Sequence, residues 1–163
     1  HFGFENWQDY NQALLSEVLR EAQSEFRPIK GEIIARDTSS DAIRAARVNI
    51  NAAQLRKSIK LEQLDFLKAI RPFDEGTIVC NPPYGERLKT EGDLPGFYEK
   101  IGSTLKHEFP NWNAWFISSD IDALKRIGFK PEKKYPLMNG KLECQLRGYS
   151  LFEGTLKELK SSQ

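Results

Sequence analysis

The sequence is poor in the residues that small secreted or metal-bound domains depend on. Only two of its 163 residues are cysteine and two are histidine. That set is too small for a zinc site, so we expect no metal. No apolar run approaches the roughly 20 residues that a membrane-spanning helix needs, and no signal peptide is visible. We therefore expect no membrane partner, a cytoplasmic location, and two reduced thiols rather than a disulfide.

The charge is nearly balanced, with 24 basic and 23 acidic residues. Net charge therefore indicates no partner, and a nucleic acid would have to be bound by a local basic patch. The length and the 39% hydrophobic content are sufficient for one domain with its own core. The chain begins with His1 on an aromatic-rich stretch that contains Phe2, Phe4 and Trp7. This start leads us to expect the interior of a longer protein.

Apolar residues alternate between helical spacing and short β-branched runs along the chain. Thr38 with Asp41 matches a helix-start pattern, and Asp93 is placed to begin a later helix. Asn139-Gly140 is a strong signal for a hairpin turn. The predicted elements are helices over 9–26, 40–53, 94–108 and 121–127, strands over 33–35, 59–64, 77–80 and 114–118, and a hairpin of 133–138 and 142–152. This order predicts an α/β fold: a mostly parallel sheet covered on both faces, with a terminal antiparallel hairpin.

Polar and aromatic residues follow the predicted strands, at the edge where open α/β sheets bind ligands. Asp37 follows the first strand. Its carboxylate can accept hydrogen bonds from the ribose hydroxyls of a nucleoside cofactor, or it can simply cap the next helix. Asp65 and Phe66 follow the second strand. Asp65 can accept a hydrogen bond from an adenine amine while Phe66 packs on the purine face. The alternative is that Asp65 caps a helix and Phe66 belongs to the core.

The third strand ends in the most specific signal, Asn81-Pro82-Pro83-Tyr84. A string like this is expected by chance in fewer than about one chain in a thousand of this length. The two prolines remove two N–H donors and keep the backbone extended. What remains is the Asn81 side-chain oxygen and the Pro82 carbonyl as acceptors, beside the flat ring of Tyr84. Such a set suits a planar base with an exocyclic amine, because the acceptors stabilise the positive charge that the nitrogen gains during methyl transfer. The alternative is a rigid turn with an exposed tyrosine.

The longer string that runs from Asn81 to Leu88, NPPYGERL, resembles the bacterial RNA methylases that carry an N-terminal THUMP domain. This family includes the 23S rRNA guanine-N2 methyltransferases, and some members are called N6-adenine-specific DNA methylases. The segment from Phe2 to Trp7, the segment from Asn139 to Glu143 and the hairpin match its layout as well. The resemblance covers nearly the whole chain and implies a Rossmann-like, class I S-adenosylmethionine-dependent methyltransferase fold.

The resemblance also implies roles for individual residues. Asp37 and Thr38 would contact the ribose side of S-adenosylmethionine, and Asp65 and Phe66 its adenine. The residues that would hold the target base are Asn81, which also neighbours the cofactor, Pro82, Pro83 and Tyr84. Arg87 would bind a phosphate or stabilise the loop.

One feature of the family is absent. Its cofactor loop, an acidic-Pro-x-x-Gly-Ser-Gly string, has no counterpart among the scattered glycines, and in the family this loop precedes the segment that begins at Phe2. We therefore expect residues 1–163 to be a partial catalytic domain that lacks the first strand and the cofactor loop. The missing N-terminal segment of the same protein is then its partner, and the piece alone binds cofactor weakly or not at all.

Three functions follow as hypotheses. The first is methyl transfer to an exocyclic amine of a base in RNA, above all guanine N2 of 23S rRNA, with the base flipped out. The second is adenine-N6 methylation of DNA. The third is a non-catalytic nucleic-acid-binding module, for which the support is a basic stretch with interleaved aromatic residues: Lys125, Arg126, Phe129, Lys130, Lys133, Lys134 and Tyr135. The alternative for that stretch is a solvated surface.

Overall fold

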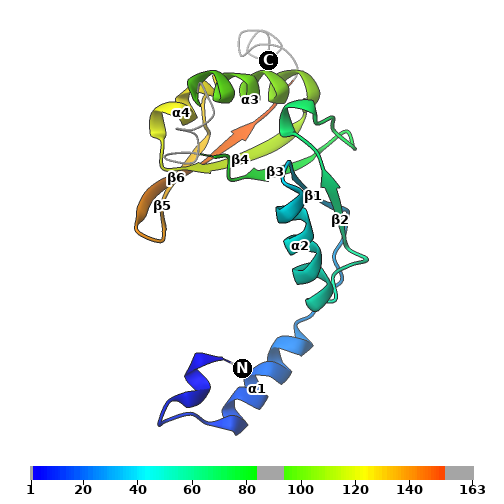
Figure 1. The fold of residues 1–163 in the computed structure, drawn as a ribbon, viewed down its shortest axis with the longest axis vertical. Coiled ribbons are helices and arrows are strands. Elements are labelled where there is room, and N and C mark those ends of the chain that lie inside the picture. Colours follow the sequence, from blue (N-terminus) through cyan, green and yellow to red (C-terminus); the bar gives the residue numbers. More distant parts are fainter. Residues whose placement is uncertain (1, 84–93, 153–163) are drawn as a thin grey trace, which may run out of the picture.

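The computed structural model describes residues 2–83 and 94–152, which form helices and two β-sheets (Figure 1). The helical elements are η1 (Gly3–Asn6), α1 (Gln12–Ser24), α2 (Ser40–Ala52), η2 (Phe66–Lys68), α3 (Leu94–Glu108) and α4 (Ile121–Arg126). The strands are β1 (Ile33–Asp37), β2 (Ile59–Gln63), β3 (Gly76–Cys80), β4 (Trp112–Ser118), β5 (Lys133–Asn139) and β6 (Leu142–Ser150). No helix within the described ranges combines the length and the apolar character that a membrane crossing requires.

The helix and strand types agree with the sequence prediction, and most differences lie at the ends. The first helix is shorter than predicted, because Asn11 caps it by accepting hydrogen bonds from the backbone N–H groups of Ala13 and Leu14. The start of the second helix at residue 40 is confirmed, but its N-cap is not Thr38, where the predicted helix-start pattern begins. Ser39 is the N-cap of α2, and its hydroxyl oxygen accepts from the N–H of Ala42. Asp93, predicted to start α3, lies outside the described residues.

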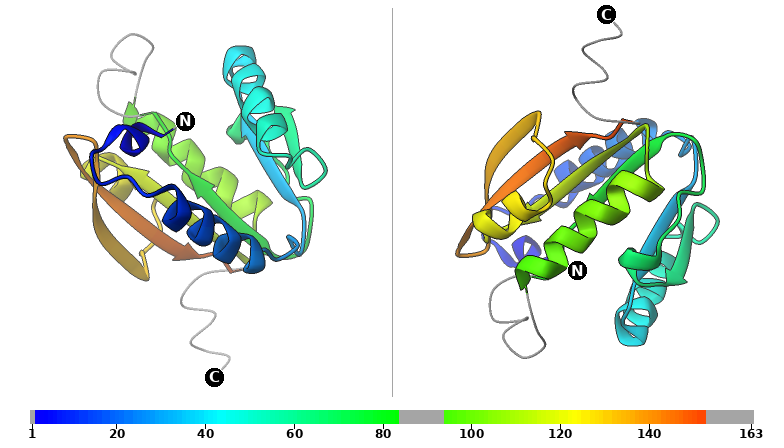
Figure 2. Two further views of the ribbon diagram at one scale, coloured as in Figure 1. Left: turned by 90° about the horizontal axis from the view of Figure 1, so that it is seen from below. Right: turned by 90° about the horizontal axis from the view of Figure 1, so that it is seen from above.

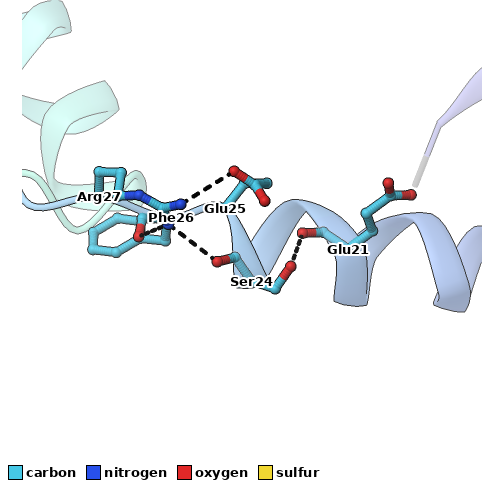
Figure 3. Close-up of polar contacts among 5 residues, drawn as sticks. All are labelled: Glu21, Ser24, Glu25, Phe26 and Arg27. Atoms are coloured by element: carbon cyan, nitrogen blue, oxygen red, sulfur yellow. Dashed lines mark hydrogen bonds and ion pairs between the residues drawn. The ribbon is translucent and has the colours of Figure 1, made fainter.

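Arg27 closes the carboxyl end of α1 (Figure 3). Its Nη1 donates to the carbonyl oxygens of Ser24 and Phe26, each at 3.2 Å. These carbonyls lie at the end of a helix, where intrahelical N–H partners run out and where the helix dipole favours a cation. The helix therefore ends just before Pro28, whose ring disfavours a helical residue in front of it.

The strands form two separate sheets. One contains β1 and β2 in parallel, and the other has the order β3-β4-β6-β5. Within the second sheet β3 and β4 are parallel, whereas β6 runs antiparallel to both β4 and β5. Over residues 2–83 and 94–152, β1 and β3 each have one unpaired edge. The two sheets lie side by side with α2 beside the smaller one (Figures 1 and 2).

The core lies on one face of the larger sheet, beneath α3 and α4 (Figure 2). Alternate residues of β4 face it, so that Ala114, Phe116 and Ser118 are fully buried. From α3, Tyr98, Ile101 and Leu105 complete this core.

The opposite face of the larger sheet is open over the described residues. Val79 on β3 is 77% exposed, and Tyr135 and Leu137 on β5 are 46% and 41% exposed. The apolar side chains of α1 are likewise exposed, and this helix stands away from the sheets (Figure 1). The predicted α/β fold with parallel strands and a terminal antiparallel hairpin is confirmed, but among the described residues helices cover one face of the larger sheet rather than both.

Candidate active site

A cavity of about 1900 Å³ lies between the two sheets. Residues at the carboxyl ends of β1 and β3, and the residues that follow β2, line it. The predicted site residues that line it are Asp37, Thr38, Asp65, Phe66, Asn81, Pro82 and Pro83. The structure thus brings together every predicted site residue that it describes. Tyr84 and Arg87 lie outside the described residues.

Asp37 ends β1 and uses one carboxylate oxygen to fix the turn into α2. Its Oδ1 accepts from the backbone N–H of Ser39 at 2.8 Å. The adjoining ends of β1 and β2 are tied together, because the carbonyl of Asp37 accepts from the N–H of Leu64 and the Gln63 side chain donates to the carbonyl of Thr38. Among the described residues, nothing donates a hydrogen bond to Oδ2 of Asp37. That oxygen lines the cavity region and can accept from a ligand hydroxyl.

Asp65 and Phe66 have the structural roles that were the alternatives to cofactor contact, a helix cap and a core aromatic residue. Oδ1 of Asp65 accepts from the N–H of Leu67 at 3.0 Å and caps η2. The ring of Phe66 stacks on Phe109 with centroids 6.0 Å apart, and its edge meets Phe116 at 6.2 Å. Both residues nonetheless border the cavity. A ligand base would meet a half-buried phenyl group there rather than a free one.

The segment Asn81–Pro83 continues directly from β3. Asn81 and Pro83 are exposed, whereas Pro82 is buried. Within residues 2–83 and 94–152 the side chain of Asn81 has no hydrogen-bond partner, so its amide oxygen is available at the cavity. The Pro83 carbonyl is already engaged, since the hydroxyl of Tyr98 lies 3.4 Å from it. This leaves the Asn81 side chain as a free acceptor beside an open cavity and not within a packed interior.

Cys80 is the last residue of β3, and its thiol is half-buried at the cavity wall. Burial raises the pKa of this thiol to about 11, and the negative charge of Asp37 adds to the shift. The carboxylate on β1 therefore acts electrostatically on a group at the end of β3. The raised pKa keeps Cys80 neutral at physiological pH, which excludes it as a nucleophile there.

The basic stretch of α4 and β5 is partly neutralised. Nζ of Lys125 lies 2.7 Å from Asp122, and Nη1 of Arg126 lies 3.3 Å from Glu99. The ring of Tyr135 stacks on Trp115, with centroids 6.2 Å apart. These pairings are those of a solvated surface and give the basic stretch no feature of a built binding site.

Two residues near the site were not singled out by the sequence reasoning. Tyr98 was placed in the apolar stripe of its helix, and Ser118 was read only as the end of a strand. Both hydroxyls are fully buried and lie 3.2 Å apart. A signal was present in the tyrosine itself, because a buried phenolic hydroxyl usually needs a hydrogen-bond partner.

The same architecture is found in solved structures. SMU.472, crystallised with SAH, is 27% identical; the match covers 96% of this chain and 41% of that one, with a TM-score of 0.77. A "possible methylase" from Clostridium difficile 630 is 26% identical, with 95% and 41% covered and a TM-score of 0.78. The chain therefore has the fold of the S-adenosylmethionine-dependent methyltransferases.

The family follows from the sequence match. Residues 3–148 match the RMKL-like methyltransferase domain, and the chain belongs to this family. Ribosomal RNA large subunit methyltransferase K/L of Pseudoalteromonas atlantica is 35% identical over 154 residues, which cover 93% of this chain and 22% of the relative. The same enzyme of Shewanella frigidimarina is 32% identical, with 92% and 22% covered. The chain thus spans between 22% and 40% of the length of the curated relatives that it matches first.

Proposed function

We propose that this chain is the catalytic part of an S-adenosylmethionine-dependent methyltransferase that acts on an exocyclic amine of a base in RNA. Guanine N2 of 23S rRNA is the proposed target, and the cytoplasm the proposed location. The observation that carries the proposal is the free side chain of Asn81 at a cavity that Asp37 and Asp65 also line. The family and its ribosomal RNA relatives support this substrate class.

The residues at the cavity fit the proposed cofactor. S-adenosylmethionine supplies an electrophilic methyl group on a sulfonium. The free Oδ2 of Asp37 can accept from a ribose hydroxyl, and Phe66 offers an apolar surface to adenine. These contacts fix the position of the cofactor at the tips of β1 and β2.

The end of β3 performs the proposed substrate chemistry. The side-chain oxygen of Asn81 and the carbonyl of Pro82 accept hydrogen bonds from the two N–H groups of the target amine. These bonds hold the nitrogen in place and stabilise the positive charge that it gains with the methyl group, while the thioether is the leaving group. The methylated nitrogen is acidic and releases its proton to water, so no strong general base is needed. We propose that Tyr84 stacks on the base and that Arg87 contacts a phosphate.

An Asn81→Ala variant tests this function in the protein that carries the chain. Ribosomal RNA that lacks the modification is incubated with S-adenosylmethionine labelled on its methyl group. We expect turnover to fall by at least a hundredfold, because the loss of one donor or acceptor to developing charge costs about that much. Asn51→Ala, which removes an exposed amide from α2, is the matched control and should keep full turnover.

The same assay separates the alternative functions. Methylation of unmethylated DNA instead of RNA would favour adenine N6. That alternative draws support from a structure named "predicted N6-adenine-specific DNA methylase" from Listeria monocytogenes, which is 27% identical with a TM-score of 0.69. A non-catalytic binding module would show no turnover, and its RNA affinity would not change in Asn81→Ala.

We further propose that the N-terminal segment of the longer protein provides a strand between β1 and β3. Among the described residues each of the two strands has one unpaired edge, residues of both line the cavity, and apolar side chains on them are exposed, with Val79 at 77% and Ile33 at 41%. One strand would fill the gap, bury these side chains and join the two sheets. Residues 1–163 alone should then bind S-adenosylmethionine weakly or not at all and be inactive. A micromolar affinity in calorimetry of residues 1–163 would contradict this.

A further inference from the structure

Tyr98 connects α3 to the segment that carries Asn81. Its side chain is fully buried, and its hydroxyl oxygen lies 3.4 Å from the carbonyl oxygen of Pro83 and 3.2 Å from Oγ of Ser118. Oγ of Ser118 in turn accepts from the backbone N–H of Asp120 at 3.1 Å. Four groups, from the segment after β3, the end of β4 and α3, thus form one polar chain, of which the Tyr98 and Ser118 hydroxyls are fully buried.

Two of the contacts have a fixed direction. The Pro83 carbonyl can only accept, so the Tyr98 hydroxyl is the donor in their contact. The Asp120 N–H can only donate, so Oγ of Ser118 is the acceptor there. The Tyr98 hydroxyl thus links the Pro83 carbonyl to Ser118 at the end of β4.

This chain matters because the prolines leave the segment with few other anchors. Pro82 and Pro83 have no N–H to donate. At the other end Cys80 is held in register with Phe116 of β4. Asn81 therefore lies between two fixed points, the sheet on one side and the Tyr98–Pro83 contact on the other.

We propose that Tyr98 is a positioning residue, which acts through the Pro83 carbonyl to orient the side chain of Asn81 for methyl transfer. The inference rests on the proposed function. Tyr98 is fully buried and is not among the described residues that line the cavity. Its effect is on the placement of the Asn81 oxygen, and small misplacements of a reacting group cost large factors in rate.

A Tyr98→Phe variant tests this in the protein that carries the chain. It keeps the ring in the core and removes only the hydroxyl. We expect kcat for RNA methylation to fall about tenfold or more while KM for S-adenosylmethionine changes less than twofold. Tyr10→Phe is the matched control, because it removes an exposed hydroxyl that donates to Gln12 at 2.6 Å, far from the segment. It should leave both parameters unchanged.

A double-mutant cycle separates positioning from general destabilisation. In an Asn81→Ala background, Tyr98→Phe should cause no further loss of kcat, because the group that it positions is gone. The side-chain amide resonance of Asn81, measured by ¹⁵N NMR, should shift or broaden in Tyr98→Phe and stay in place in Tyr10→Phe.

The outcomes are distinguishable. The role of Tyr98 would be overturned if the double variant lost kcat by the product of the two single losses. It would also be overturned if Tyr98→Phe kept the wild-type kcat and left the Asn81 resonance unmoved. In both cases Asn81 keeps its proposed function. Full turnover of Asn81→Ala would overturn the proposed function and, with it, positioning through Asn81.

Discussion

Gly102 in α3 lies so close to the backbone of Ile127 that a Cβ atom at position 102 would overlap the Ile127 carbonyl oxygen. Ile127 follows α4, so this contact sets how near the two helices approach. A glycine inside a helix lowers helix stability by about 1 kcal/mol relative to alanine. Its presence here is explained by the space that it leaves for the neighbouring carbonyl.

Replacement of this glycine should destabilise the fold. Gly102→Ala gains helix propensity but forces α3 and α4 apart, and overpacking of this kind typically costs about 1–3 kcal/mol. We expect a net loss of about 1 kcal/mol, seen as a lower urea midpoint at an unchanged m-value. Gly3→Ala is the control, since nothing lies within 4 Å of a Cβ at that position. Equal midpoints for Gly102→Ala and the wild type would show that the helices can separate freely.

The pairing of β1 with β2 is reinforced by an ion pair. Arg36 and Glu62 are register partners, and Nε of Arg36 lies 2.7 Å from Oε2 of Glu62. Hydrogen bonds from Lys60 and then Arg36 lower the pKa of Glu62 below its usual 4.5. A lowered pKa means that the stabilisation is present above pH 4.5 and is lost as the pH falls through the lowered value.

We therefore expect Glu62→Gln to destabilise the chain at pH 7 by about 1 kcal/mol. The difference between variant and wild type should shrink from pH 7 to pH 3, because the pH then falls through the lowered pKa of Glu62 and the carboxyl becomes protonated. Urea unfolding at the two pH values measures this, with the exposed Glu17→Gln in α1 as control. A difference that persists undiminished at pH 3 would assign the effect to packing rather than charge.

Much of the local structure could be predicted from the sequence, because it depends on neighbours along the chain. The bounds of α3, Leu94–Glu108, are those predicted from its apolar stripe. The predicted hairpin is present, but its turn is one residue later than predicted: Asn139 still pairs with Leu142, and the turn is Gly140-Lys141. Gly140 has the positive φ of 63° that the first position of such a turn favours. The convergence of Asp37 and Asn81 at one cavity also follows from strand direction alone.

What could not be predicted depends on pairing between distant segments. The apolar pattern identified Val79 as a strand residue but could not say that the β3 edge next to it lacks a neighbouring strand. Alternation likewise does not reveal which strands are joined, so the separation of β1 and β2 from the larger sheet was not foreseen. The Tyr98–Ser118 contact joins positions 20 residues apart that only the tertiary fold brings together.

The thiol of Cys80 should react slowly with alkylating agents, although it lines the cavity. A pKa of about 11, against the ordinary 9.0, leaves about a hundredfold less thiolate near pH 8. Iodoacetamide labelling of a Cys144→Ser variant, followed by mass spectrometry, measures the reaction rate of Cys80. The rate at pH 8 should be about a hundredfold below that of a free thiol, and it should rise about tenfold per pH unit up to pH 10. Asp37→Asn should speed the labelling, because it removes the negative charge that contributes to the shift. Rapid labelling at pH 8 would mean that Cys80 is not in the environment described.

Asp37 should control cofactor affinity more than turnover. Its free carboxylate oxygen is the proposed acceptor for ribose hydroxyls, and hydrogen bonds to a charged group contribute about 1.5–3 kcal/mol. In the protein that carries the chain, Asp37→Ala should therefore raise the Kd for S-adenosylmethionine by about 10- to 150-fold, measured by calorimetry. Asp41→Asn is the matched control, because Asp41 is an exposed acid of α2 that pairs with Arg44. Since Oδ1 of Asp37 also holds the turn at Ser39, unfolding midpoints of both variants must be compared. An unchanged Kd in a folded Asp37→Ala variant would show that Asp37 does not bind the cofactor. A raised Kd together with an unchanged kcat at saturating cofactor would show that Asp37 acts in binding alone.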